Sequence, residues 1–226
     1  MIALIFDYLG TIAFAISGAL VGMQRRMDIF GIAILALATA VGGGMIRDTL
    51  VGNTPPSALE DGSYIAISLV TVVALLFSFR RLRGNYKYRR YSLYLYNLAD
   101  TFGLASFTVT GAMVGVAADP RSIFLLPVTL GLITACGGGI IRDIGALRIP
   151  VVFRNEVYAS ASLAGGIVFC LVRQIATLAW AGPLAFLTVM LIRLLAIRYK
   201  LELPRAHRRD YLGKNKRLSL IHISEP

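Results

Sequence analysis

The chain alternates long apolar stretches with short polar segments, many of them basic. Seven stretches approach the length of about 20 mainly apolar residues that a membrane-spanning helix needs. They cover residues 3–23, 29–50, 62–79, 93–117, 122–146, 156–175 and 177–197. A transmembrane barrel would instead show short segments of alternating polarity, a pattern that this sequence does not have. The first stretch lacks a preceding basic segment, so we expect a retained helix rather than a cleaved signal peptide. The pattern predicts an all-α integral membrane protein with seven transmembrane helices.

Composition supports this fold class, and the positions of the cysteines and histidines argue against a metal site or an enzyme. Hydrophobic residues make up 57% of the 226 residues and charged residues 15%, and the mean hydropathy is +0.71, which is too apolar for a soluble domain. Cys136 and Cys170 lie inside apolar stretches without metal-ligand spacing, so we interpret them as packed thiols. Both histidines, His207 and His222, lie in the C-terminal tail. We therefore predict no cofactor, no metal site and no enzymatic constellation.

The basic residues behind the net charge of +11 follow the membrane pattern. Seven spans place the connecting segments alternately on two sides, and one side receives little more than Arg121 and Arg173. The other side receives Arg25, Arg26, Arg80, Arg81, Arg83, Lys87, Arg89, Arg90, Arg148, Arg154 and the tail from residue 198 to residue 217. The positive-inside rule predicts that this side is cytoplasmic, with the N-terminus outside and the C-terminus inside. We interpret the basic, tyrosine-rich segment at 80–96 as a lipid-facing loop with an aromatic belt, not as a nucleic-acid site.

One sequence pattern occurs twice. Gly-Gly-Gly-Met-Ile-Arg-Asp at 42–48 returns as Gly-Gly-Gly-Ile-Ile-Arg-Asp at 137–143. Upstream, a constant offset of 93 relates Asp7, Gly10, Phe14, Gly18, Ala19 and Gly22 to Asp100, Gly103, Phe107, Gly111, Ala112 and Gly115. Because the repeated unit holds three helices, the second copy enters the membrane from the opposite side, which makes an inverted repeat. The predicted division is 3–92, 93–176, an unmatched seventh helix at 177–199 and a tail at 200–226.

The glycine triplets lie past the middle of the second and fifth predicted helices. They consist of Gly42, Gly43 and Gly44 in the first copy, and of Gly137, Gly138 and Gly139 in the second. Each glycine costs roughly 1 kcal/mol relative to alanine in a helix, so a kink or local unwinding that exposes backbone carbonyls to a cavity is favoured. The alternative is that the glycines permit a close helix crossing, as small residues do in membranes.

Charged residues flank each triplet. Asp7, Arg47 and Asp48 fall at the outer end of the first two helices, whereas Asp100, Arg142 and Asp143 fall at the cytoplasmic end of the fourth and fifth. We predict ion pairs between Asp7 and Arg47 and between Asp100 and Arg142, one at each mouth of a path between the copies, because pairing lowers the cost of charges near hydrocarbon. The pairs either brace the helices or close the path.

Two hydroxyl residues also follow the repeat. Ser17 and Thr110 precede Gly18 and Gly111, deep in the first and fourth helices. Each hydroxyl either bonds a carbonyl of its own helix or faces a permeating ion.

Taken together, the two GGGxxRD motifs, the DxxGxxxFxxxG patterns at 7–18 and 100–111 and the three-plus-three-plus-one helices resemble the bacterial branch of the trimeric intracellular cation (TRIC) channels. That family also carries an uncharacterised-protein label and a glycine transporter domain name. The resemblance covers about residues 2–199. It implies a homotrimer in the bacterial inner membrane, with glycine-kinked second and fifth helices lining a pore in each protomer for monovalent cations, above all K⁺. The lysine motif of the animal members is replaced here by Arg142-Asp143, so lipid or voltage control is not implied.

Two functions stay open at this point. A passive cation channel expects a continuous wet path, whereas a carrier for a small solute such as glycine expects alternating access to a site near the midplane. Membrane lipids and the permeant species are the expected partners, and the subunit count does not follow from the residues. Residues 218–226, Leu-Ser-Leu-Ile-His-Ile-Ser-Glu-Pro, read like a translated sequencing adaptor, so we expect the natural sequence to be interrupted near Arg217.

Overall fold

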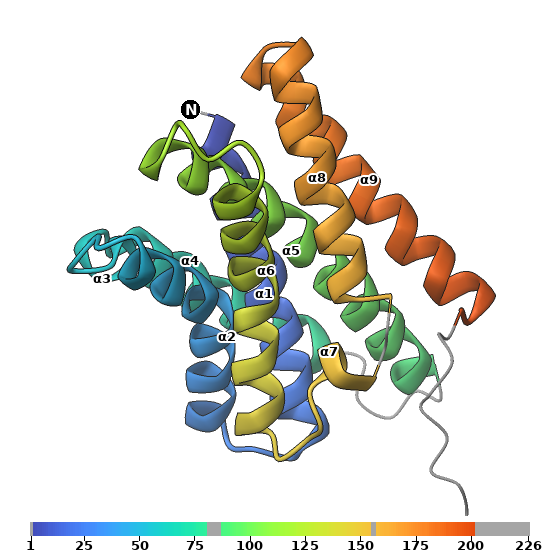
Figure 1. Cartoon of the computed structure of the whole chain (residues 1–226). Helices are drawn as coiled ribbons and strands as arrows, with labels where there is room; N and C mark the ends of the chain where they lie inside the picture. Colours follow the sequence, from blue (N-terminus) through green and yellow to red (C-terminus); the bar gives the residue numbers. More distant parts are fainter. Residues whose placement is uncertain (1, 81–86, 155–156, 202–226) are drawn as a thin grey trace, which may run out of the picture.

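The structure, a computed structural model, describes residues 2–80, 87–154 and 157–201 (Figure 1). All regular secondary structure over these ranges is helical. The long helices are α1 (Ile2–Gln24), α2 (Ile29–Leu50), α4 (Ser63–Arg80), α5 (Lys87–Ala118), α6 (Leu125–Gly145), α8 (Ala159–Ile175) and α9 (Leu178–Tyr199). Two single-turn helices, α3 (Ser57–Glu60) and α7 (Val151–Arg154), precede α4 and α8.

Five of the long helices, α1, α2, α5, α6 and α9, are long and apolar enough to cross a membrane. The other two, α4 and α8, are shorter apolar helices. Large apolar side chains such as Leu125 and Ile175 are exposed on the outside of the bundle, as expected for a surface in contact with lipid. The chain is therefore an all-helical membrane protein, as predicted, and the count of seven spans stays a prediction.

Four helices form the centre of the molecule. Within it, α1 packs against α2 and α5, and α6 packs against α2 and α5. Helix α4 covers α1 and α2, while α8 and α9 run side by side and pack on α5 and α6 (Figure 1). The matched helices of the two copies, α1 with α5 and α2 with α6, thus meet in one core, and α9 is an addition to the second copy.

Repeated phenylalanines and glycines hold this core together. The rings of Phe14 and Phe107 lie 5.1 Å apart in an edge-to-face arrangement, and both are buried. A Cβ on Gly103 would collide with the Phe14 ring, and a Cβ on Gly10 would approach the Phe107 ring to 2.9 Å. Each copy therefore supplies an aromatic ring and the glycine surface that receives the ring of the other copy.

The glycine triplets do not interrupt their helices. Helix α2 continues to Leu50 and α6 to Gly145, so the expected local unwinding is wrong, and a bend without unwinding stays a prediction. The close-crossing alternative explains Gly43 and Gly138, because a Cβ on Gly43 would overlap the carbonyl oxygen of Thr134 and a Cβ on Gly138 would overlap that of Thr39. Contact between the two backbones stabilises the regular helix and offsets the low helix propensity of glycine.

Candidate functional site

The first charged cluster, Asp7, Arg47 and Asp48, lies where α1 meets the end of α2. Arg47 Nη1 is 3.7 Å from Asp7 Oδ1, and Arg47 Nε donates to Asp48 Oδ1 at 2.8 Å. The hydroxyl of Tyr64, at the start of α4, donates to Asp7 Oδ2 at 2.9 Å. The predicted pair of Asp7 and Arg47 is therefore confirmed.

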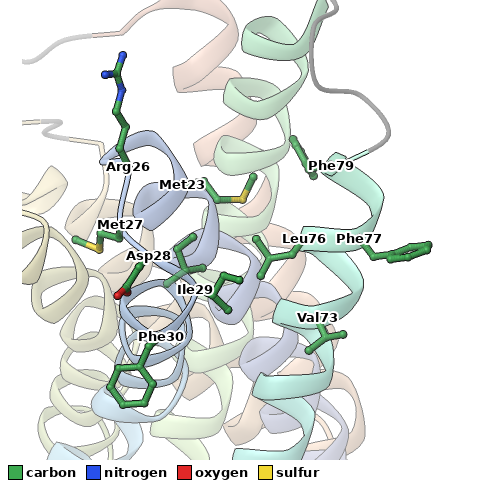
Figure 2. Close-up of a pocket in the computed structure, with 11 residues that line it drawn as sticks. Met23, Arg26, Met27, Asp28, Ile29, Phe30, Val73, Leu76, Phe77 and Phe79 are labelled. Atoms are coloured by element: carbon green, nitrogen blue, oxygen red, sulfur yellow. The ribbon is translucent and has the colours of Figure 1, made fainter.

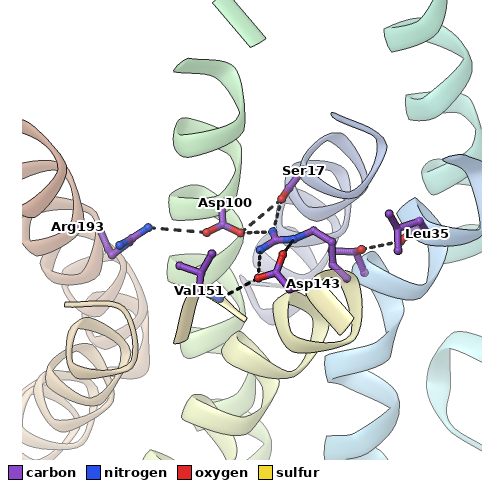
Figure 3. A network of polar contacts seen from close by, with 8 residues as sticks. Ser17, Leu35, Asp100, Asp143, Val151 and Arg193 are labelled. Atoms are coloured by element: carbon purple, nitrogen blue, oxygen red, sulfur yellow. Dashed lines mark hydrogen bonds and ion pairs between the residues drawn. The ribbon is translucent and has the colours of Figure 1, made fainter. Parts of the chain in front are cut away.

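The second charged cluster, Asp100, Arg142 and Asp143, repeats this arrangement between α5 and α6. Arg142 Nη1 donates to Asp100 Oδ1, and Arg142 donates through Nε and Nη2 to the two oxygens of Asp143 at 3.0 and 3.2 Å. Figure 3 shows Ser17, Asp100 and Asp143 pointing toward one another from three helices. The predicted pair of Asp100 and Arg142 is confirmed as well.

Each cluster is also tied to a single-turn helix. Asp48 Oδ2 accepts a hydrogen bond from the Ser57 backbone N–H at 3.0 Å, and Asp143 Oδ2 accepts one from the Val151 backbone N–H at 2.9 Å. A carboxylate near the start of a helix satisfies a backbone donor that has no partner within that helix. The second residue of each Arg-Asp motif thus connects an arginine to the polypeptide that turns back toward the next long helix.

The two clusters differ in their access to solvent. A cavity of about 410 Å³ lies beside the first cluster, and its polar lining consists of Asp7, Arg47, Asp48, Asn53, Ser57 and Thr110. The Asp7 side chain is 16% exposed. In the second cluster the side chains of Asp100, Arg142 and Asp143 are at most 1% exposed, and the Arg142 guanidinium lies 5.1 Å from the centre of the Tyr96 ring. The first cluster therefore faces a cavity, whereas the second is buried among the helices.

Both predicted hydroxyl residues lie beside the cluster of the other copy. Ser17 Oγ accepts a hydrogen bond from Arg142 in the second cluster, whereas Thr110 lines the cavity at the first cluster and bonds the Phe107 carbonyl of its own helix at 3.5 Å. Ten residues separate Asp7 from Ser17, or about 15 Å along a helix. This rise carries Ser17 away from the charged cluster of its own copy and toward that of the other copy.

Sequence reasoning missed Arg193 on α9. Its side chain is 5% exposed, and its Nη2 lies 3.8 Å from Asp100 Oδ2. The available signal was an arginine inside the apolar run 177–197, because an ionisable residue within a span marks either a functional site or a partner. Figure 3 shows Arg193 approaching Asp100 from the side opposite Ser17 and Asp143.

These charges form two ion-pair clusters. Within residues 2–80, 87–154 and 157–201, no group of three or more His, Cys, Asp or Glu side chains has the spacing to hold a metal ion. The first cluster has two carboxylates and one guanidinium, so it carries one negative charge in excess. Arg193 brings the second cluster to two charges of each sign.

A larger cavity, of about 1080 Å³, lies away from both clusters (Figure 2). It lies between the turn from α1 to α2 and the second half of α4, and apolar side chains such as Ile29, Leu76 and Phe77 line most of it. Asp28, which also lines it, caps α2 by accepting the Gly31 N–H at 2.6 Å. This cavity shares no lining residue with the charged clusters, so we do not assign it to a path between the copies.

Some predictions fall outside the described residues. They concern Arg81 and Arg83 of the basic loop and the tail from residue 202 onward, which holds both histidines and the suspected adaptor sequence at 218–226. The free cysteines, Cys136 and Cys170, are both buried, in agreement with their interpretation as packed thiols.

Comparison with known proteins identifies relatives along most of the chain. The sequence model of the family described as "Glycine transporter" matches residues 4–80 and 97–174. The UPF0126 inner membrane protein YadS of Escherichia coli is 38% identical over 200 residues, covering 88% of this chain and 93% of its own length. A UPF0126 membrane protein of Vibrio cholerae is 36% identical over 208 residues, which is 88% of this chain and 81% of that protein.

Solved structures share the fold. A prokaryotic TRIC channel crystallised in 0.5 M KCl superposes with a TM-score of 0.81 at 30% identity, over 90% of this chain and 99% of that one. The TRIC trimeric intracellular cation channel orthologue from Rhodobacter sphaeroides superposes with a TM-score of 0.78 at 30% identity, over 88% of this chain and 98% of that one.

Proposed function

The chain belongs to the glycine transporter family, which includes the bacterial UPF0126 membrane proteins and TRIC channels, and on that premise we propose that it is a membrane channel for monovalent cations. The path runs inside each protomer, between the two inverted copies, from the open first cluster to the sealed second one. A solved relative supports a cation as the permeant species, since the Rhodobacter sphaeroides structure is that of a trimeric intracellular cation channel orthologue.

The observation that carries the proposal is the excess negative charge in the open cavity. Asp7 is part of the cavity lining and is the most exposed carboxylate of the two clusters. An arginine at the mouth of a cation path is unfavourable by itself, but two carboxylates outweigh Arg47 here. A cavity with low-dielectric walls and one net negative charge raises the local concentration of cations and repels anions.

The finer features of the proposal follow the family and the charge pattern. We propose K⁺ as the principal cation, a homotrimeric assembly with a path in each protomer, and residence in the bacterial inner membrane in contact with lipid. The basic loops favour an outer N-terminus and a cytoplasmic C-terminus, and reporter proteins fused to either end test this orientation. The proposal includes no enzymatic activity, no cofactor and no nucleic-acid partner.

A glycine carrier is the second candidate, and one observation favours it. A structure with one open mouth and one sealed mouth is also what an alternating-access carrier would adopt. In that case Arg47, which lines the open cavity, would bind the carboxylate of the amino acid. The carrier requires the two mouths to exchange their states around a bound solute, whereas the channel requires both to open together.

Neutralising Asp7 separates the two candidates. Purified wild-type protein, Asp7→Asn and the control Asp119→Asn are reconstituted in liposomes, and the uptake of K⁺ and of glycine is measured. Asp119 is an exposed loop carboxylate between α5 and α6. We expect Asp7→Asn to lower K⁺ uptake by about fivefold or more, since one charge controls local cation concentration, and Asp119→Asn to leave it unchanged. Saturable glycine uptake without K⁺ uptake would refute the channel.

A further inference from the structure

Helix α9 brings a second arginine to the sealed cluster, and the repeat supplies no equivalent at the open one. Arg193 is 4% exposed, its Nη2 lies 3.8 Å from Asp100 Oδ2, and its guanidinium carbon lies 4.7 Å from the centre of the Tyr158 ring. This geometry combines an ion pair with a cation–π contact. Burying an arginine at such depth is costly, so its position calls for a partner or a function.

The oxygen that faces Arg193 lacks a hydrogen bond. Asp100 Oδ2 is buried and accepts none from any described residue, whereas Asp7 Oδ2, its equivalent in the first copy, accepts one from Tyr64 at 2.9 Å. The separation of 3.8 Å from Arg193 Nη2 is longer than a hydrogen bond. The negative charge of Asp100 Oδ2 is therefore balanced by a nearby cation that does not bind it directly.

The two arginines of the second cluster are held very differently. Arg142 donates four hydrogen bonds, to Ser17, Asp100 and both oxygens of Asp143. Arg193 Nε donates none within the described part of the chain. Releasing Arg142 would leave several buried partners unpaired, whereas releasing Arg193 breaks one long ion pair and one cation–π contact. Arg142 is suited to brace the helices, and Arg193 is suited to move.

We propose that Arg193 is a tethered cation that closes the second mouth, with its guanidinium next to Asp100 Oδ2 where a permeating monovalent cation binds when the mouth opens. The inference rests on the proposed channel function. Opening moves the Arg193 side chain, or α9 with it, away from Asp100. The second cluster then carries one negative charge in excess, as the first cluster does. The unmatched seventh helix then gives an otherwise symmetric pair of mouths a gate on one side.

Removing the charge of Arg193 tests the proposal in the full chain. Wild-type protein, Arg193→Gln and Arg193→Lys are reconstituted in planar bilayers, and their open probability in KCl is recorded. The matched control is Arg198→Gln, because Arg198 lies on the same helix but is exposed. We expect Arg193→Gln to raise the open probability about fivefold or more, the lower end of a typical coupling between a switch and its site. Arg193→Lys keeps the charge and should stay near wild type, as should Arg198→Gln.

The outcomes distinguish the gate from the channel function itself. If the wild type conducts K⁺ and folded Arg193→Gln shows either an unchanged open probability or no current, the tethered cation is overturned and the channel function stands. No K⁺ current from wild type or any variant would overturn both. Should Arg193→Gln fail to fold, Arg193→Met, which keeps the apolar length of the side chain and leaves Asp100 paired with Arg142, is recorded against the same expectation.

Discussion

At the scale of single residues, the aspartate of each Arg-Asp motif contacts more of the structure than a simple counter-ion does. Asp143 accepts hydrogen bonds from two nitrogens of Arg142 and from the backbone of α7, and its side chain is 1% exposed. Asp48 makes the equivalent bonds to Arg47 Nε and to the start of α3. The aspartates thus stabilise the arginines and the chain reversal that follows each central helix.

Replacing Asp143 by asparagine should destabilise the protein strongly. The amide keeps the size of the side chain but removes the negative charge beside a buried guanidinium, and breaking a buried ion pair costs about 3–5 kcal/mol. Thermal unfolding in detergent measures the effect, with the exposed Asp119→Asn as the control. Equal unfolding midpoints for the two variants would contradict the bracing role.

At the scale of helices, the contribution of each glycine to packing depends on what faces it, not on the number of glycines in the triplet. Gly43 and Gly138 lie at the contact between α2 and α6, where each would place a Cβ against a carbonyl oxygen of the facing helix. Gly44, in the same triplet, would place its Cβ 3.7 Å from the Arg47 side chain, at ordinary van der Waals distance. The helices therefore depend on one glycine of the first triplet far more than on its neighbour.

Alanine substitutions at Gly43 and Gly44 should change the free energy of unfolding in opposite directions or by different amounts. Gly43→Ala forces α2 and α6 apart and should cost about 1–3 kcal/mol or more, as overpacking does, while Gly44→Ala should be neutral or slightly stabilising because alanine favours a helix. Thermal unfolding of the two variants in detergent makes the comparison. A stability loss for Gly44→Ala as large as that for Gly43→Ala would instead favour a flexible-hinge role for the whole triplet.

The sequence predicted the elements that depend on local periodicity and on the repeat. The bounds of α2 were predicted as 29–50 and observed as Ile29–Leu50, and the alternating direction of the spans placed Asp7 near Arg47 and Asp100 near Arg142. Helix α5 begins at Lys87 rather than 93, since charged and tyrosine-rich residues at its start hid a helix that continues out of the apolar stretch. The single-turn helices were missed because four residues carry no periodicity.

Other features of the site depend on tertiary contacts that spacing does not encode. Arg193 lies on a helix without a repeat partner, so no offset related it to Asp100. Ser17 and Thr110 each lie beside the cluster of the other copy because of the length of a helix. This placement can be recognised only when the packing of the two copies is known. The contacts of Arg142 with the Tyr96 ring and of Arg193 with the Tyr158 ring also depend on packing, and sequence reasoning did not connect these tyrosines with the charges.

At the scale of the whole molecule, an inverted repeat produces two similar charged clusters, and the additional helix makes them unequal. The first cluster carries one negative charge in excess beside a cavity of about 410 Å³, while the second is buried, with balanced charges and an arginine from α9. In the proposed function, the symmetric part of the fold forms the path and the departure from symmetry closes it. A cation channel is the function that this arrangement supports best.

The most direct test of this account is single-channel recording of the purified wild-type chain in planar bilayers under a K⁺ gradient, with glycine added to one side. The account predicts step-like currents that reverse near the K⁺ equilibrium potential and do not respond to glycine. Bilayers that show no unitary K⁺ current, while liposomes containing the same preparation accumulate glycine saturably, would contradict it.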